Sequence, residues 1–291
     1  MIHLSLPTGV SIPNLGLGTW RMGESRERRG AEIAAVRTAI ELGYRLIDTA
    51  EMYGEGGAEE VVGQAVAEAL RAGDVRREEL FIVSKVYPHN ASRRGTAAAC
   101  DRSRRRLGLE HIDLYLLHWR GEHPLVETVE AMHSLMMAGP IAHWGVSNFD
   151  TDDMEELARI PSARTVEDAR RGCATNQVYY SLSERGPEFS LLPWLHAHKL
   201  PLMAYSPIDQ GALARDRSLA AIGARHGVTA AQVALAWIAS QAGVVAIPKA
   251  VGAEHLRDNF QAATLALSAE DRLQIEQRFP APGRKTPLAM V

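Results

Sequence analysis

Four reactive side chains lie at, or just past, the ends of three short apolar segments. The segment RLIDTAEMYG carries Asp48 at the end of its apolar run and Tyr53 five residues later. LFIVSKV has Lys85 as its penultimate residue, and IDLYLLH ends at His118. Charged groups at the ends of buried segments are costly to remove from water, so these positions favour a chemical role.

Together the four groups fit the reduction of a carbonyl. Asp48 could hold Lys85, whose ammonium would lower the pKa of Tyr53 from about 10 and make it a proton donor near neutral pH. His118 could donate a hydrogen bond to an oxygen that gains negative charge. No side chain carries hydride, so a nicotinamide would be required. Taken singly, each residue could equally be structural: an ion pair, a loop phenol or a buried histidine.

The segments that position these residues alternate along the sequence between a helical and a strand-like pattern of apolar residues. Helical stripes such as Ile33–Val36–Ile40 and Val62–Val66–Leu70 separate short apolar segments that are typical of strands. Alternation of this kind predicts parallel strands joined by helical crossovers. The eight predicted strands are 15–20, 45–50, 80–86, 112–118, 142–148, 174–180, 201–207 and 244–250.

Eight such units predict an α/β fold, a (β/α)8 TIM barrel that spans 1–291 as a single domain. We also expect an N-terminal β-hairpin that turns at Pro7-Thr8-Gly9 and an extra C-terminal helix. A doubly wound sheet is the alternative, but no G-x-G-x-x-G follows the first strand. The charged segment 163–173 is interpreted as an insertion or a lengthened helix.

Composition excludes several classes of function. The net charge of -3 implies no broad attraction to nucleic acid or membrane, and no apolar stretch is long enough to span a bilayer. The first residues, MIHLSLPTGV, lack the pattern of a signal peptide. Cys100 and Cys173 form no C-x-x-C pair, and no His, Cys or carboxylate cluster has metal-ligand spacing. We expect a cytoplasmic protein without a metal.

From GLGTW (16–20) to PGRKTPL (282–288), the sequence resembles the aldo-keto reductase family. The stretches DTAEMYG, IVSKVYP and DLYLLHW carry the resemblance at the four reactive positions. It implies a bacterial NAD(P)H-dependent aldehyde and ketone reductase whose catalytic tetrad is Asp48, Tyr53, Lys85 and His118.

The resemblance also implies a cofactor site. Ser147, Asn148 and Gln177 would hold the nicotinamide carboxamide by hydrogen bonds, and the ring would stack on Tyr205. The other cofactor-binding positions that it implies are Gly18, Thr19, Trp20, Ser206, Pro207, Ile208, Gln210, Gly211, Ile247, Lys249, Ala250, His255, Asp258 and Asn259.

The adenosine end departs from the family pattern. Lys249 is kept and can meet a 2′-phosphate, whereas Ala250 replaces a serine, His255 an arginine and Asp258 a glutamate. The sequence favours NADPH, with NADH as the alternative.

On the substrate side, Trp20, Tyr87 and Trp119 would form aromatic walls, although ordinary packing explains Tyr87 equally well. In the family that the sequence resembles, the C-terminal loop narrows the pocket, so the short tail after Pro280 implies an open site for small aldehydes, dicarbonyls or aromatic aldehydes. The family resemblance favours a monomer.

Two other classes of function remain as hypotheses. A cofactor-binding regulatory module can share this fold and the tetrad, although no extra N-terminal segment or interaction domain is seen in the sequence. A metal-dependent barrel hydrolase or isomerase could use Asp48 and His118, but it leaves Lys85 and Tyr53 unexplained.

Overall fold

The structure is a computed structural model that describes residues 2–160 and 172–290. The insertion or lengthened helix predicted at 163–173 lies, except for its last two residues, outside the described residues.

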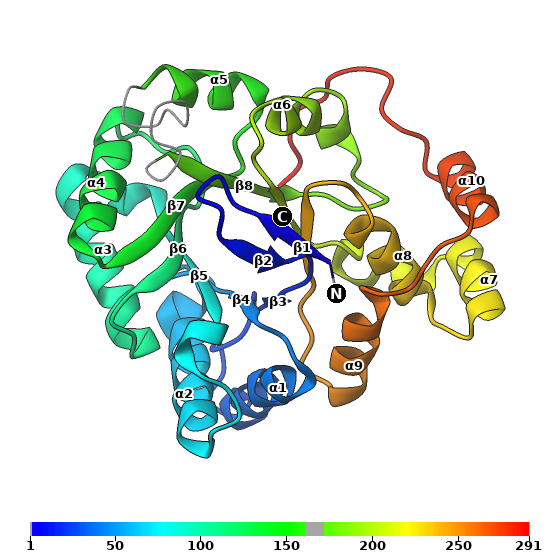
Figure 1. Cartoon of the computed structure of the whole chain (residues 1–291), viewed down its shortest axis with the longest axis horizontal. Coiled ribbons are helices and arrows are strands. Elements are labelled where there is room, and N and C mark those ends of the chain that lie inside the picture. The colour runs from blue at the N-terminus through cyan, green and yellow to red at the C-terminus, as the bar shows by residue number, and fades with distance from the viewer. Residues whose placement is uncertain (1, 161–171, 291) are drawn as a thin grey trace.

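Eight parallel strands follow one another around a barrel in sequence order (Figure 1). They are β3 (Leu17–Gly18), β4 (Leu46–Asp48), β5 (Phe81–Val86), β6 (Ile112–Leu117), β7 (Ile141–Ser147), β8 (Cys173–Tyr179), β9 (Leu202–Tyr205) and β10 (Val244–Ile247). The first and last strands meet through the Gly16 N–H, which donates to the Ala246 carbonyl at 2.8 Å, and the Gly18 N–H, which donates to Pro248 at 3.0 Å. The predicted (β/α)8 barrel is confirmed.

Helices surround the strands (Figure 1). They are α1 (Arg29–Leu42), α2 (Gly57–Ala72), α3 (Arg93–Leu107), α4 (Leu125–Ala138), α5 (Thr151–Arg159), α6 (Leu191–Ala197), α7 (Arg217–His226), α8 (Ala230–Ala239), α9 (Ala253–Ala262) and α10 (Ala269–Arg278). Local signals set their ends: α1 stops at Gly43, whose φ of 106° suits glycine, and Thr229 caps α8 by accepting the Gln232 N–H. The predicted C-terminal helix is α10.

The alternation of side chains along each strand separates two cores. Ile47 and Ile82 face the helices, in one large cluster with Val36 and Ile40 of α1. Leu46, Val83 and their equivalents on other strands point inward and fill the barrel.

The N-terminal hairpin closes one end of the barrel. Its strands, β1 (His3–Ser5) and β2 (Ser11–Pro13), are antiparallel, as expected. Leu6 and Ile12 join the inward-facing cluster of the barrel. The interior is therefore sealed at the end where the strands begin, and the opposite end is left for a site.

Candidate active site

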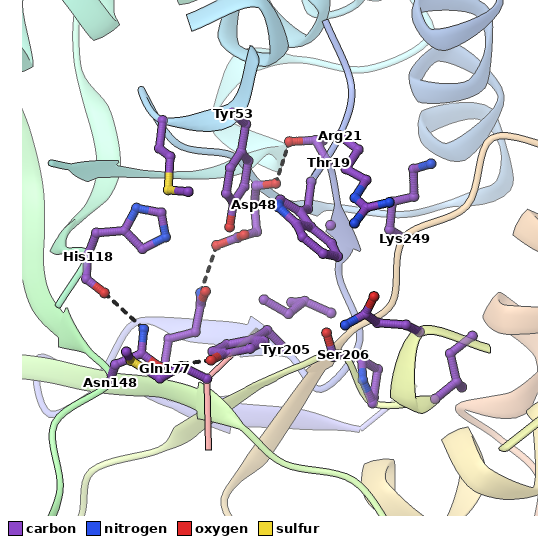
Figure 2. A pocket seen from close by; sticks show the side chains of 18 of the residues that line it. Thr19, Arg21, Asp48, Tyr53, His118, Asn148, Gln177, Tyr205, Ser206 and Lys249 are labelled. Atoms are coloured by element: carbon purple, nitrogen blue, oxygen red, sulfur yellow. Dashed lines mark hydrogen bonds between the residues drawn. The ribbon is translucent and has the colours of Figure 1, made fainter. Parts of the chain in front are cut away.

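A cavity of about 460 Å³ opens at the carboxyl ends of the strands (Figure 2). Most of the residues that the sequence predicts for the site line it: Gly18, Thr19, Trp20, Asp48, Tyr53, His118, Trp119, Asn148, Gln177, Tyr205, Ser206, Pro207, Ile208, Gln210, Gly211, Ile247 and Lys249. Three residues that sequence reasoning missed, Arg21, Met52 and Met290, line it as well.

The two-residue period of strands aims the reactive groups at this cavity. Leu46 and Val83 point into the barrel, so Asp48 and Lys85, two residues further along β4 and β5, point the same way. His118 follows Leu116 of β6 at the same spacing. On β4, β5 and β6, the side chains that point into the barrel are therefore apolar until the carboxyl end of the strand. The last inward-pointing side chain there is a reactive one.

Lys85 connects the acid and the phenol. Its fully buried ammonium donates hydrogen bonds to Asp48 Oδ2 at 2.7 Å, to the Thr49 carbonyl at 2.9 Å and to Tyr53 Oη at 3.2 Å. An ammonium has three N–H groups, so these contacts use all of them. Because Tyr53 Oη accepts a hydrogen bond here, its own O–H remains available to donate into the cavity.

The pKa of Tyr53 differs from the sequence-based expectation. We expected the ammonium to lower it, but burial raises the pKa of Tyr53 well above its ordinary value, and the negative charge of Asp48 raises it further. That expectation is wrong because the phenolate would be desolvated as well as stabilised by Lys85. Burial also lowers the pKa of Lys85, against the opposing pull of Asp48.

His118 is a neutral imidazole in this setting. Burial, aided by the positive charge of Lys85, holds the pKa of His118 well below its usual range. The His118 and Tyr53 rings meet edge to face with centroids 5.6 Å apart. Nδ1 is buried and has no hydrogen-bond partner among the described residues.

The depressed pKa of His118 makes a prediction for the pH dependence of activity. A histidine with a lowered pKa becomes charged only at a pH well below 6.5, so kcat/KM for carbonyl reduction should show no inflection from His118 near the ordinary histidine pKa of about 6.5. The measurement is a pH–rate profile of the wild type beside His118→Gln. A fall centred near the ordinary histidine pKa that the variant lacks would contradict this result.

The residues predicted to hold the carboxamide form one hydrogen-bonded network. Gln177 Nε2 donates to Asp48 Oδ1 at 2.7 Å, and Ser147 Oγ donates to the backbone carbonyl of Gln177 at 2.8 Å. Asn148 Nδ2 donates to the His118 carbonyl at 3.0 Å, while its Oδ1 accepts from Tyr205 Oη at 2.9 Å. Asn148 Nδ2 also donates to Ser147 Oγ at 3.2 Å, so the network links the Asp48 carboxylate and the His118 backbone carbonyl to the Tyr205 hydroxyl. Figure 2 shows the bonds from Gln177 to Asp48, from Asn148 to the His118 carbonyl and from Tyr205 to Asn148. Ser147 is buried behind the cavity lining.

The loop after β9 is held in a strained conformation. Ser206, Asp209 and Gln210 have φ values of 49°, 48° and 49°, in the left-handed region that non-glycine residues rarely adopt. Tyr179 Oη donates to the Asp209 carboxylate and keeps the loop in place. Such strain is common where a loop binds a ligand.

A positive end of the cavity is formed by Arg21 and Lys249 (Figure 2). Lys249 is exposed and forms no side-chain hydrogen bond or ion pair within the described residues. The Arg21 guanidinium lies 4.4 Å from the centroid of the Trp20 ring. The adjacency of Arg21 to the GLGTW motif is the sequence signal that could have identified it.

Several predicted residues lie outside the cavity lining. Ala250 is buried next to Lys249, and His255, Asp258 and Asn259 lie on α9, with His255 exposed. Tyr87 lies behind the wall, where it packs edge to face against Trp119 with centroids 5.6 Å apart.

The C-terminal tail reaches the cavity through Met290. The length of the tail alone does not predict this contact. Lys285 donates to Asp152 at 2.7 Å and fixes the tail beside α5.

Two negative findings apply to residues 2–160 and 172–290. No cluster of three or more His, Cys, Asp or Glu side chains is arranged to hold a metal ion there. None of the helices in this part of the chain combines the length and apolar character needed to cross a membrane.

Comparison with known proteins agrees with this architecture. The model of the aldo/keto reductase family matches residues 14–278. The chain is 46% identical to methylglyoxal reductase YeaE of Escherichia coli over 97% of this chain and 96% of that protein. It is 35% identical to the glyoxal reductase of Bacillus subtilis, over 94% and 91% of the two chains. An aldo/keto reductase from Klebsiella pneumoniae, crystallised with NADP and acetate, superposes with a TM-score of 0.92 at 44% identity and 99% coverage of both chains.

The fold and the cavity define an oxidoreductase built on a (β/α)8 barrel. The chain belongs to the aldo/keto reductase family, as its sequence predicts, and it reduces aldehydes and ketones to alcohols with a reduced nicotinamide cofactor.

Proposed function

We propose that this protein reduces small dicarbonyl compounds with NADPH, and that Tyr53 is the proton donor. The observation that carries the proposal is the hydrogen-bonding of Lys85, which donates to Tyr53 Oη and leaves the phenolic proton directed to the cavity. A metal-dependent reaction would give Lys85 and Tyr53 no role.

The roles of the side chains follow from their charges. NADPH supplies the hydride when bound. Tyr53 keeps its proton at neutral pH because its pKa is raised, and it can release that proton only to a stronger base, such as the oxygen of a carbonyl that has gained hydride. Neutral His118 donates a hydrogen bond to the same oxygen, and Lys85 stabilises the phenolate left behind. Asp48 and Gln177 hold Lys85 and the cavity floor in position.

Features of the cavity fit a dinucleotide. The Tyr205 ring offers a flat surface for a nicotinamide, and the loop from Ser206 to Gly211 borders the space beyond it. Arg21 and Lys249 supply positive charge at one end, where a phosphate could bind. NADP and NADPH complexes of Klebsiella pneumoniae relatives support NADPH for this chain.

The preference for NADPH makes a specific prediction for Lys249→Met. Loss of a charge-assisted hydrogen bond to the 2′-phosphate should weaken NADPH binding by about 10–100-fold, because such bonds contribute roughly 1.5–3 kcal/mol. NADH lacks that phosphate, so its affinity should stay within about twofold. Fluorescence titration with both cofactors measures the ratio, and an equal loss for the two would remove Lys249 from phosphate recognition.

The substrate class follows from the walls of the cavity and from the relatives. Trp20, Trp119, Met52 and Met290 present apolar surface around the reactive centre. The relatives from Escherichia coli and Bacillus subtilis are named as methylglyoxal and glyoxal reductases.

The test of this substrate class is a panel of methylglyoxal, glyoxal, 4-nitrobenzaldehyde and simple ketones, followed through NADPH or NADH oxidation. Efficient turnover of a dicarbonyl with NADPH is expected; oxidation that stops after one cycle would favour a regulatory role.

We further propose that residues 1–291 act as one domain, as a cytoplasmic monomer. Cys100 and Cys173 are free and buried, in keeping with a reducing compartment. Light scattering behind size-exclusion chromatography would test the state of association against the mass of 31.8 kDa.

A further inference from the structure

A second carboxylate near the active site has no role in the mechanism above. Glu51, between Asp48 and Tyr53 in sequence, is only 5% exposed and is not part of the cavity lining. Burial of a carboxylate is costly unless hydrogen bonds compensate it. The hydrogen-bond donors around the Glu51 carboxylate show which segments of the chain it holds together.

Among residues 2–160 and 172–290, the partners of its side chain come from the connection between β5 and α3 or from α3 itself. Glu51 Oε1 accepts the backbone N–H of Tyr87 at 2.8 Å and the side-chain amide of Asn90 at 2.9 Å. Oε2 accepts from the Arg102 guanidinium at 3.2 Å. Glu51 thus ties the Asp48–Tyr53 segment to the loop 87–90.

That loop supports the Trp119 wall. Tyr87 packs edge to face against Trp119, and the Trp119 ring lies 4.9 Å from the His118 ring, measured between centroids. The loop also contacts the segment after Trp119. A Cβ added at Gly121 would lie 2.7 Å from Pro88 Cβ, so the Gly121 backbone is closely packed against Pro88.

His123 adds a polar link between the same two segments. Its Nε2 lies 3.1 Å from the His89 carbonyl. The loop 87–90 and the segment 119–123 are therefore coupled by an aromatic pair, a close packing contact and a hydrogen-bond contact. A shift of the first would displace the Trp119 ring at the cavity.

We propose that Glu51 is a positioning residue that fixes the Trp119 wall through Tyr87 and thereby sets the affinity for carbonyl substrates bulky enough to contact that wall. This inference rests on the proposed function in that the cavity is taken to bind a carbonyl substrate.

The test uses Glu51→Gln, which keeps the shape but places an NH₂ group where only donors approach. Loss of at least one charge-assisted hydrogen bond should raise KM for 4-nitrobenzaldehyde by about tenfold. KM for the smaller methylglyoxal, kcat and the Kd of NADPH should each change by no more than about twofold. Equal increases in KM for both aldehydes, or no increase, would overturn the proposal.

Asp113→Asn is the matched control for lost stability. Asp113 accepts the Ile82 N–H at 2.8 Å and an Arg77 guanidinium N–H at 2.7 Å. It thus binds a backbone amide and an arginine as Glu51 does, but near the starts of β5 and β6. The control should lower Tm without raising KM for the aromatic aldehyde, and a matching rise in KM would assign the Glu51 effect to general destabilisation.

Coupling through Tyr87 gives a second criterion. If Glu51 acts through this residue, Tyr87→Ala and the double variant with Glu51→Gln should have the same KM for 4-nitrobenzaldehyde. Additive effects would refute the coupling.

A readout that needs no turnover separates this inference from the proposed function. In protein labelled with 5-fluorotryptophan, the Trp119 resonance, assigned through Trp119→Phe, should shift in Glu51→Gln and Tyr87→Ala but not in Asp113→Asn. An unmoved Trp119 signal in Glu51→Gln would refute the positioning role even if the wild type reduced no aldehyde in the panel.

Discussion

Tyr53→Phe is expected to lower kcat for carbonyl reduction by a factor of about 10²–10⁴, the contribution usual for a general acid. The variant removes one oxygen and leaves the ring that packs against His118. NADPH affinity should remain within about twofold, because Tyr53 is not among the proposed cofactor contacts, which lie on β3, on β7 to β10 and on the segments that follow these strands. Stopped-flow measurement of NADPH oxidation and a fluorescence titration give the two quantities.

Measuring both kcat and NADPH affinity distinguishes the loss of a proton donor from general damage to the cavity. A variant that lost NADPH affinity in parallel with kcat would point to a disturbed cavity instead of a missing proton donor. A variant with wild-type kcat would exclude Tyr53 as the donor.

Lys85→Met should affect stability and catalysis together. It removes the ammonium that contacts Asp48, Thr49 and Tyr53, and it leaves the Asp48 carboxylate buried with Gln177 as its remaining side-chain partner. Breaking a buried pair on one side costs about 3–5 kcal/mol of unfolding free energy. We also expect kcat to fall by about 10² or more, because the phenolate of Tyr53 loses its positive neighbour.

A second substitution separates these two effects. Asp48→Asn in the Lys85→Met background removes the unpaired charge, so most of the unfolding free energy should return while kcat stays low. Urea unfolding followed by circular dichroism provides the free energies. If Lys85→Met alone were as stable as the wild type, the buried pair would not hold the site together as proposed.

The sequence predicted that the candidate reactive residues lie together because strand geometry is regular. Once 80–86 and 112–118 are read as inward-facing strands, the two-residue period directs Lys85 and His118 to the same end of the barrel as Asp48. Turn and cap signals such as Gly43 and Thr229 mark helix ends by local chemistry alone, and the structure places both at those ends.

Properties that depend on distant packing could not be predicted in this way. The pKa of Tyr53 is governed by burial, which a list of charged neighbours does not reveal. Met290 reaches the cavity only because the tail after α10 returns across the barrel. Glu51 reads as an ordinary loop acid until its partners Tyr87, Asn90 and Arg102 are seen around it.

The central claim is that one carbonyl oxygen is held between the phenol and the imidazole. A crystal structure of the protein with NADP⁺ and a small carboxylate, whose oxygen stands in for the carbonyl oxygen, tests it most directly. We predict a ligand oxygen within about 2.6–3.2 Å of both Tyr53 Oη and His118 Nε2. An oxygen bound away from these two atoms, with the dinucleotide in place, would contradict the claim.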